Sequence, residues 1–207
     1  MKWRPSQIGK LMTAPKSKSE NLSQGAKSEI RRIAKEHFYG YTTEITTKPV
    51  LKGLQFEQAG IDLLNSVRFG ANYVKNKIRL ENEYLNGCCD IITENLIIDI
   101  KSPWSLETFP ATEEEGYDSL YEWQGRGYMQ LYDRPRFELI YTMYSTDNDL
   151  LTDWDNRSIH KVDHINPAKR ITELSFDRDQ EKEEYMLDKL RYCSEYYSQY
   201  MQQLNNK

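Results

Sequence analysis

The chain has 207 residues and a mass of 24.6 kDa, which suits one domain with a hydrophobic core. With 38% hydrophobic and 29% charged residues and no apolar run near the roughly 20 residues of a membrane helix, the composition excludes a disordered chain and an integral membrane protein. Three cysteines give no disulfide framework and the N-terminal segment lacks a signal-peptide pattern, so we expect a reducing, cytoplasmic setting.

Charge is distributed unevenly along the chain. The net charge of -4 argues against a protein that coats nucleic acid through bulk positive charge. Residues 1–52 hold 11 Lys or Arg and 4 Glu, whereas residues 53–207 hold 17 Lys or Arg and 28 Asp or Glu. A basic arm therefore precedes an acidic body. Charge alone leaves open whether the arm binds phosphates or only covers exposed helix faces.

Hydrophobic spacing predicts two helices in the basic arm. The first covers about 6–15 and the second 23–39, where apolar residues recur at helical intervals and Gly40 follows as a C-cap. A third helix is predicted for 51–68. Across 77–101 the apolar period changes from 3.6 to 2, which indicates a β-sheet.

The second half of the chain is predicted to alternate helix and strand. A helix fits 117–132 and a strand fits 136–145. The Asp-rich stretch 147–157 is predicted to be an exposed loop, and one or two strands are expected within 158–176.

A long amphipathic helix is predicted to begin at Asp177. Its apolar, Tyr-rich stripe could bind a partner. Because such stripes are the ordinary means by which helices dock, we expect it to cover one face of the sheet.

The most informative segment is a predicted β-hairpin that carries two aspartates. Two β-branched runs flank Glu94–Asn95, and Asn tolerates the left-handed conformation of a tight turn. With the turn there, Asp90 lies opposite Asp99, and strand alternation puts Lys101 on the face of both carboxylates. Opposed like charges are destabilising and need compensation. Two interpretations stay open: the site of a hard divalent cation such as Mg2+, or a surface ion cluster.

Two helices add candidate side chains to this pair. Glu57 falls within the apolar arc of 51–68, where a buried carboxylate needs a metal ion or a positioned water. The alternatives are that Glu57 pairs with Arg68 or lies at the rim of the arc. In the helix after the hairpin, Gln124 and Tyr128 share one face.

Four short motifs occur along the chain in a fixed order. They read RPSQIGKLM, KGLQFEQ, GCCD with DIK and KSPWS, and EWQGRGYM. In this order and spacing they resemble the motifs of the PD-(D/E)xK nuclease superfamily, and within it the lambda-type, or YqaJ-like, phage recombination exonucleases.

Three positions depart from the pattern of these relatives. Gln124-Gly125-Arg126 stands where many of them have Gln-x-Gln, which bears on substrate contacts. Asp99 stands where the commonest version has Glu. Arg4 lies near the matching serine but is offset from the arginine that binds the 5′-phosphate in relatives.

The resemblance implies an α/β (α+β) fold with a restriction-endonuclease-like core, in which helices flank a central mixed β-sheet. An N-terminal helical arm and a long C-terminal helix would complete it. Residues 1–207 would form a single nuclease domain. It would comprise a basic helical arm (1–50), a catalytic core (51–145), and outer strands with the C-terminal helix (146–207).

The resemblance also implies the site residues. The implied catalytic residues are Glu57, Asp90, Asp99, Lys101 and Gln124. The implied metal ligands are Asp90, Asp99, Glu57 and the backbone carbonyl of Ile100, holding one or two Mg2+ ions that Mn2+ could replace. Lys101 would orient the attacking water, and Gln124 would position the nucleophile or the phosphate.

DNA contacts follow from the same resemblance. The implied DNA-binding residues are Arg4, Ser6, Lys10, Arg126 and Tyr128. Other basic residues of the arm, including Lys27, Arg31 and Arg32, would contact phosphates without reading sequence.

The implied reaction is 5′ to 3′ digestion of one strand of linear double-stranded DNA in phage recombination. Implied partners are DNA ends, a single-strand annealing protein and further copies of the chain in a ring, often a trimer, and the location would be the host cytoplasm. Two alternatives stay open: a repair or restriction-type endonuclease with the same site, and an inactive DNA- or partner-binding module.

Overall fold

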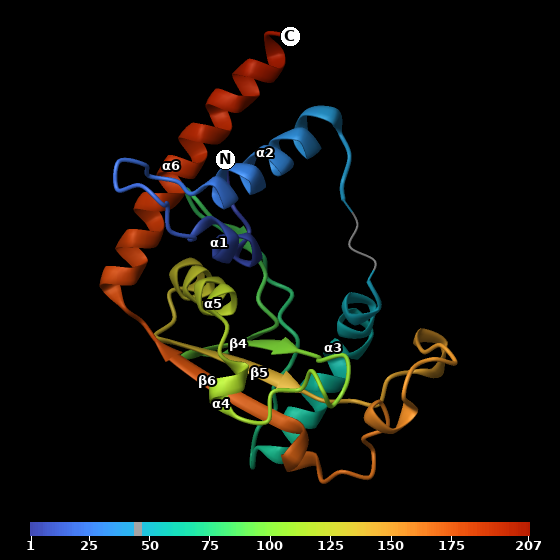
Figure 1. The fold of residues 1–207 in the computed structure, drawn as a ribbon. Coiled ribbons are helices and arrows are strands. Elements are labelled where there is room, and N and C mark those ends of the chain that lie inside the picture. Colours follow the sequence, from blue (N-terminus) through green and yellow to red (C-terminus); the bar gives the residue numbers. More distant parts are fainter. Residues whose placement is uncertain (44–46) are drawn as a thin grey trace.

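A mixed four-stranded sheet lies between helices that pack on its two faces (Figure 1). The computed structural model describes residues 1–43 and 47–207, so the short stretch 44–46 of the predicted basic arm lies outside the described residues. The strand order is β3-β4-β5-β6, with β4 and β5 parallel and the other pairs antiparallel. The four strands are β3 (Ile91–Ile92), β4 (Leu96–Lys101), β5 (Arg136–Thr142) and β6 (Ile171–Asp177).

The remaining elements are mostly helical. The helices are α1 (Pro5–Leu11), α2 (Gln24–Tyr39), α3 (Lys48–Val67), α4 (Glu113–Gly116), α5 (Ser119–Tyr132) and α6 (Gln180–Asn205). A separate antiparallel pair is formed by β1 (Leu80–Glu81) and β2 (Asn86–Gly87). This arrangement is the mixed α/β fold that the sequence predicts.

The hairpin register is the predicted one. Ile91 pairs with Ile98 and Ile92 with Ile97, so the turn falls at residues 93–96. Ile98 and Ile100 face α3, where they join a buried apolar cluster. The alternate residues of β4 face α5 instead, which places Asp99 and Lys101 on that side.

Both helices that cover the sheet need a glycine at the contact. A Cβ at Gly60 of α3 would lie 2.8 Å from Ile100 and 2.9 Å from Thr142. A Cβ at Gly125 of α5 would collide with the ring of Phe137 on β5. Close packing to the sheet therefore explains why these helices tolerate a residue that weakens a helix by about 1 kcal/mol relative to Ala.

Helix ends follow the capping signals. The Ser23 side chain accepts a hydrogen bond from the Ala26 backbone at the start of α2, and Gly40 ends the helix with φ of 68°. Helix α3 begins at Lys48, three residues earlier than predicted, because Pro49 suits the first turn of a helix.

In the C-terminal third, the prediction of one or two strands within 158–176 is confirmed by β6, and residues 158–170 before it hold short 3-10 helices and turns. The predicted packing of the C-terminal helix on the sheet is wrong. Helix α6 packs mainly along α2, in the layer outside α5, rather than on the sheet (Figure 1). Its apolar stripe joins the core made by α1, α2 and α5.

Among the described residues, no helix has the length and apolar character needed to cross a membrane.

Candidate active site

The candidate site is a cleft of about 570 Å3 at the carboxyl end of β4. One wall is the first half of α3, which contributes Glu57, and another is the chain that follows β4. Asp90, Asp99 and Lys101 line the same cleft. The hairpin and α3 therefore bring together four of the five predicted catalytic residues, although they come from separate segments of the sequence.

Asp90 and Asp99 sit side by side across the hairpin. Asp90 Oδ2 accepts a hydrogen bond of 2.8 Å from the backbone N–H of Ile100, next to Asp99 in the opposite strand. Burial and then the charge of Asp99 raise the pKa of Asp90 well above its usual range. Two carboxylates held this close in a buried site favour a cation beside them.

Lys101 and Gln124 hold the two oxygens of Asp99. The Gln124 side-chain amide donates a 2.9 Å hydrogen bond to Asp99 Oδ1. Lys101 Nζ forms an ion pair of 2.5 Å with Asp99 Oδ2, an oxygen that is buried and bonded to no other group of the described residues. The Lys101 ammonium also lies 4.7 Å from the ring centre of Tyr121 on α5.

The Lys101 side chain is a cation in this environment. Burial lowers its pKa, but the adjacent Asp99 carboxylate raises it, and the net pKa lies above the usual value for lysine. Lys101 can therefore orient a ligand and offset negative charge, whereas it is not a neutral base.

Glu57 is paired by a lysine that the sequence analysis did not select. Lys75 Nζ lies 2.5 Å from Glu57 Oε2, whereas Arg68, the partner considered from sequence, pairs with Glu138 and Glu173. The segment around Lys75 is irregular, so no periodic pattern could place it opposite α3.

The backbone around Asp90 is held by side chains behind the site. Hydroxyls of Tyr132 and Tyr128 on α5 and the amide of Asn76 donate to the carbonyl oxygens of residues 87–89, at 3.1, 3.0 and 3.2 Å respectively. The backbone N–H of Asn76 also donates to the Asp90 carbonyl at 2.7 Å. These bonds satisfy the backbone carbonyl oxygens at the end of β2 and in the chain that joins β2 to β3, and they fix the position of Asp90.

Two predicted DNA contacts are placed inside the protein. Arg126 is 4% exposed and donates through Nε and Nη2 to Glu122 Oε1, at 2.9 and 2.6 Å. Tyr128 is 7% exposed, and its hydroxyl is committed to the carbonyl of Cys88. Their burial argues against the predicted contact of either side chain with DNA.

The other predicted DNA contacts lie at the surface. Arg4, Ser6 and Lys10 are exposed at or next to α1, which packs against α5. The Cβ of a side chain at Gly9 would lie 2.6 Å from the backbone of Leu120, so this packing is close. None of the three side chains lines the cleft itself.

The donor set in the cleft fits a hard divalent cation. The described residues include no group of three His, Cys, Asp or Glu side chains already converged on one point, and lysines pair with both Glu57 and Asp99. However, Asp99 Oδ2 lacks a hydrogen bond, and Asp90 has a raised pKa that a cation would lower. Carboxylate and carbonyl oxygens are the ligands that Mg2+ and Mn2+ prefer.

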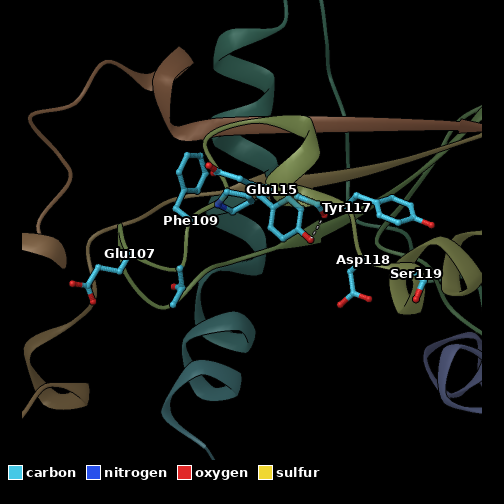
Figure 2. Close-up of a pocket in the computed structure, with 10 residues that line it drawn as sticks. Glu107, Phe109, Glu115, Tyr117, Asp118 and Ser119 are labelled. Carbon is cyan, nitrogen blue, oxygen red and sulfur yellow. Dashed lines mark hydrogen bonds between the residues drawn. The ribbon is translucent and has the colours of Figure 1, made fainter.

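A neighbouring cavity of about 640 Å3 differs in chemistry from the cleft (Figure 2). It shares Thr108 and Tyr141 with the cleft, and its rim carries Glu107, Glu115 and Asp118. No Lys or Arg lines it, so this acidic cavity does not suit a phosphate backbone.

The mixed sheet, with an acidic pair and a lysine on the hairpin at one of its edges, is the arrangement expected of a nuclease of the PD-(D/E)xK superfamily. No family model and no curated protein sequence matches the chain. A phage-related exonuclease from Haemophilus somnus 129PT is 30% identical with a TM-score of 0.92, and the alignment covers 99% of this chain and 96% of that one. The chain belongs to this family of phage-related exonucleases, whose lambda-type motifs it carries.

More distant structures share the fold. The alkaline exonuclease LHK-Exo from Laribacter hongkongensis is 11% identical with a TM-score of 0.73, and its complex with dAMP is 13% identical with a TM-score of 0.71. Each alignment covers 99% of this chain and 92% of the other. The fold therefore persists where little sequence identity remains.

Proposed function

We propose that this nuclease is a metal-dependent exonuclease that hydrolyses linear double-stranded DNA from 5′ to 3′ in phage recombination. The observation that carries the proposal is the meeting of Asp90, Asp99 and Lys101 in one cleft, with Gln124 bonded to Asp99. Support also comes from the relatives, which are exonucleases, one of them in complex with dAMP.

The metal ligands would be Asp90, Asp99 and the backbone carbonyl of Ile100, with Glu57 available for a second ion. Mg2+ bound there, or Mn2+ in its place, would activate water and stabilise negative charge on the phosphate. To bind this second ion, the Glu57 carboxylate would first release its ion pair with Lys75.

Side chains of the protein would supply the remaining parts of the reaction. Lys101, as an ammonium, would orient the attacking water and offset the charge that develops on the phosphate. Gln124 would keep Asp99 in position and direct its remaining amide hydrogen toward the nucleophile or the phosphate. The ring of Tyr121 would hold the Lys101 ammonium over the cleft.

DNA would approach from the basic arm. Exposed Arg4, Ser6 and Lys10 would contact phosphates of the duplex and position its end. Residues 1–207 would act as a single nuclease domain in the cytoplasm of the phage's host, within a ring of copies such as a trimer, and hand a 3′ overhang to an annealing protein.

Digestion of end-labelled duplexes tests this proposal. We expect Mg2+-dependent release of nucleotides from linear 5′-phosphorylated duplex, no cutting of a closed circular duplex, and protection by phosphorothioate linkages placed at the 5′ ends. Asp99→Ala should lower the rate by about 100-fold or more. Asp62→Asn is the matched control, since Asp62 is exposed on α3 and bonded only to Gln58 among the described residues.

Three outcomes would contradict parts of the proposal. Cleavage of the circular duplex would indicate an endonuclease, and protection only by blocked 3′ ends would reverse the polarity. A wild-type protein that releases no nucleotide from linear, circular or single-stranded DNA with Mg2+ or Mn2+ would leave only the binding-module alternative.

A further inference from the structure

Lys52 is a fully buried lysine in the wall of the candidate active site. Its side chain has no exposed surface, and it is the only buried residue within 48–59, the first three turns of α3. These turns carry Glu57 and line the cleft. Lys52 is one of several contacts of this half of the helix: the ring of Phe56 stacks on Tyr144 with centroids 5.6 Å apart, and the Tyr144 hydroxyl donates a hydrogen bond to the Ala59 carbonyl. Among these contacts Lys52 is the one with no exposed surface.

The Lys52 ammonium joins two other segments of the chain. Its Nζ donates to the carbonyl oxygen of Trp104 at 3.0 Å and to that of Tyr144 at 2.9 Å. The Trp104 carbonyl also accepts a hydrogen bond from Thr146 Oγ1 at 3.1 Å. Bonds from an ammonium to carbonyls are about twice as strong as neutral ones, and they are directional.

Lys52 has no carboxylate partner among the described residues, so it does not serve as a counter-ion. Burial lowers its pKa to about 8, which reflects the unfavourable transfer of its charge from water. An apolar side chain would avoid that penalty. Its evident contribution is therefore to satisfy the two carbonyls and to hold their segments at a fixed distance from α3.

Those segments border the catalytic residues. Trp104 is three residues after Lys101, and residues 102–104 line the cleft. This wall has no regular secondary structure, so its position depends on individual hydrogen bonds such as those at the Trp104 carbonyl. Lys52 thus ties α3, which carries Glu57, to the wall that follows Lys101.

We infer that Lys52 is a positioning residue for the nuclease reaction, which acts through the Trp104 carbonyl to hold the two walls of the cleft in catalytic register. The inference rests on the proposed function. It does not assign Lys52 any contact with DNA or with the reacting atoms.

The chain offers a matched control in Lys189, another buried lysine. Lys189 is 3% exposed and donates to the carbonyls of Met12 and Thr13 at 3.2 and 2.8 Å, on α6 and away from the cleft. Lys52→Met and Lys189→Met remove the same charge and the same kind of bonds. Only the first should lower kcat, whereas Lys189→Met, which loosens the end of α1, can change duplex affinity but not the cleft.

The experiment compares both variants with wild-type protein on linear 5′-phosphorylated duplex. For Lys52→Met we expect kcat to fall at least tenfold, with duplex affinity in a chelator within about twofold of wild type, since binding to the exposed arm is untouched. Amide hydrogen exchange should accelerate at residues 102–106 and in the first turns of α3. Lys189→Met should keep kcat and exchange at the cleft unchanged, at a comparable loss of thermal stability.

Equal kcat losses in the two variants, or unchanged exchange at residues 102–106 in Lys52→Met, would overturn the inference. If Lys52→Met does not fold, Thr146→Val decides, because it removes the other donor to the Trp104 carbonyl with little change of shape. A lower kcat with faster exchange at 102–106 supports the inference, and wild-type values overturn it. Inactivity of the wild-type protein would instead refute the proposed function.

Discussion

Replacing Glu122 by Gln should destabilise the protein in a manner that depends on pH. The Glu122 carboxylate, in the first turn of α5, is 8% exposed and accepts hydrogen bonds from three cationic or phenolic partners. Arg126 donates two bonds and Lys182 one, of 2.8 Å, to Oε1, while the Tyr117 hydroxyl donates to Oε2 at 2.8 Å. Gln keeps the size of the side chain but removes the charge that faces Arg126.

The magnitude follows from the pKa of Glu122. Burial raises this pKa, but hydrogen bonds from Lys182, Arg126 and Tyr117 lower it, to about 2 from the usual 4.5. At 1.36 kcal/mol per unit this corresponds to about 3 kcal/mol, which we reduce to about 2 because Lys182 is 46% exposed and screened by water. The buried Arg126 left without a counter-charge adds to the loss, so we expect about 2 to 4 kcal/mol at pH 7.

The pH dependence has a definite sign. Because the folded-state pKa of Glu122 lies below the unfolded value, its contribution is complete above about pH 4.5 and is lost as the pH falls toward about 2. Urea unfolding followed by tryptophan fluorescence at pH 7 and pH 3 measures it. The difference in the free energy of unfolding between wild type and Glu122→Gln should be smaller at pH 3 than at pH 7. Glu195→Gln, which breaks a half-exposed pair on α6, should cost less than about 0.5 kcal/mol at either pH.

A difference in unfolding free energy below about 0.5 kcal/mol at pH 7 would refute this account of the buried ion network. A difference at pH 3 as large as that at pH 7 would refute it too.

Three further outcomes are expected. Gly125→Ala should destabilise by about 2 to 4 kcal/mol because the new methyl collides with a β5 ring, whereas Gly53→Ala, where a Cβ meets nothing within 4 Å, should stabilise α3 by about 0.5 to 1 kcal/mol; urea unfolding checks both. Tyr128→Phe should lose about 1 kcal/mol of stability but bind DNA as wild type does in fluorescence anisotropy, since its hydroxyl is bonded inside the protein. Burial raises the pKa of Cys89 and Cys193 to about 12, so mass spectrometry should find both thiols unmodified after iodoacetamide treatment of folded protein at pH 8.

Local signals in the sequence were sufficient for the hairpin and for most helices. The turn residues and β-branched runs predicted the pairing of Ile91 with Ile98, and strand alternation then placed Asp99 and Lys101 on one face. Ser23 and Gly40 marked the ends of α2 because caps act through neighbouring backbone groups. The core of the site was predictable for the same reason, since it depends on one short-range register.

Contacts between residues that are far apart in the sequence could not be predicted from local sequence patterns. Lys75 meets Glu57 from an irregular segment, and Lys52 is buried although its residue type favours the surface. Arg126 was predicted to contact DNA because the resemblance places it in a motif that bears on substrate contacts. Its burial depends on Glu122 one turn earlier and on Lys182 of α6, and only the packed structure brings the latter alongside.

The lysines that pair with the cleft carboxylates affect whether the domain can fold without a metal ion. Lys75 and Lys101 balance the charge of Glu57 and Asp99 from within the chain, so the domain can fold before a metal ion binds. A zinc finger, by contrast, collapses when its metal is withdrawn. On the proposed metal dependence, chelation should stop turnover while the protein stays folded, with a melting temperature lower only by the stabilisation that a bound cation adds. Returning the cation should restore turnover without any refolding step.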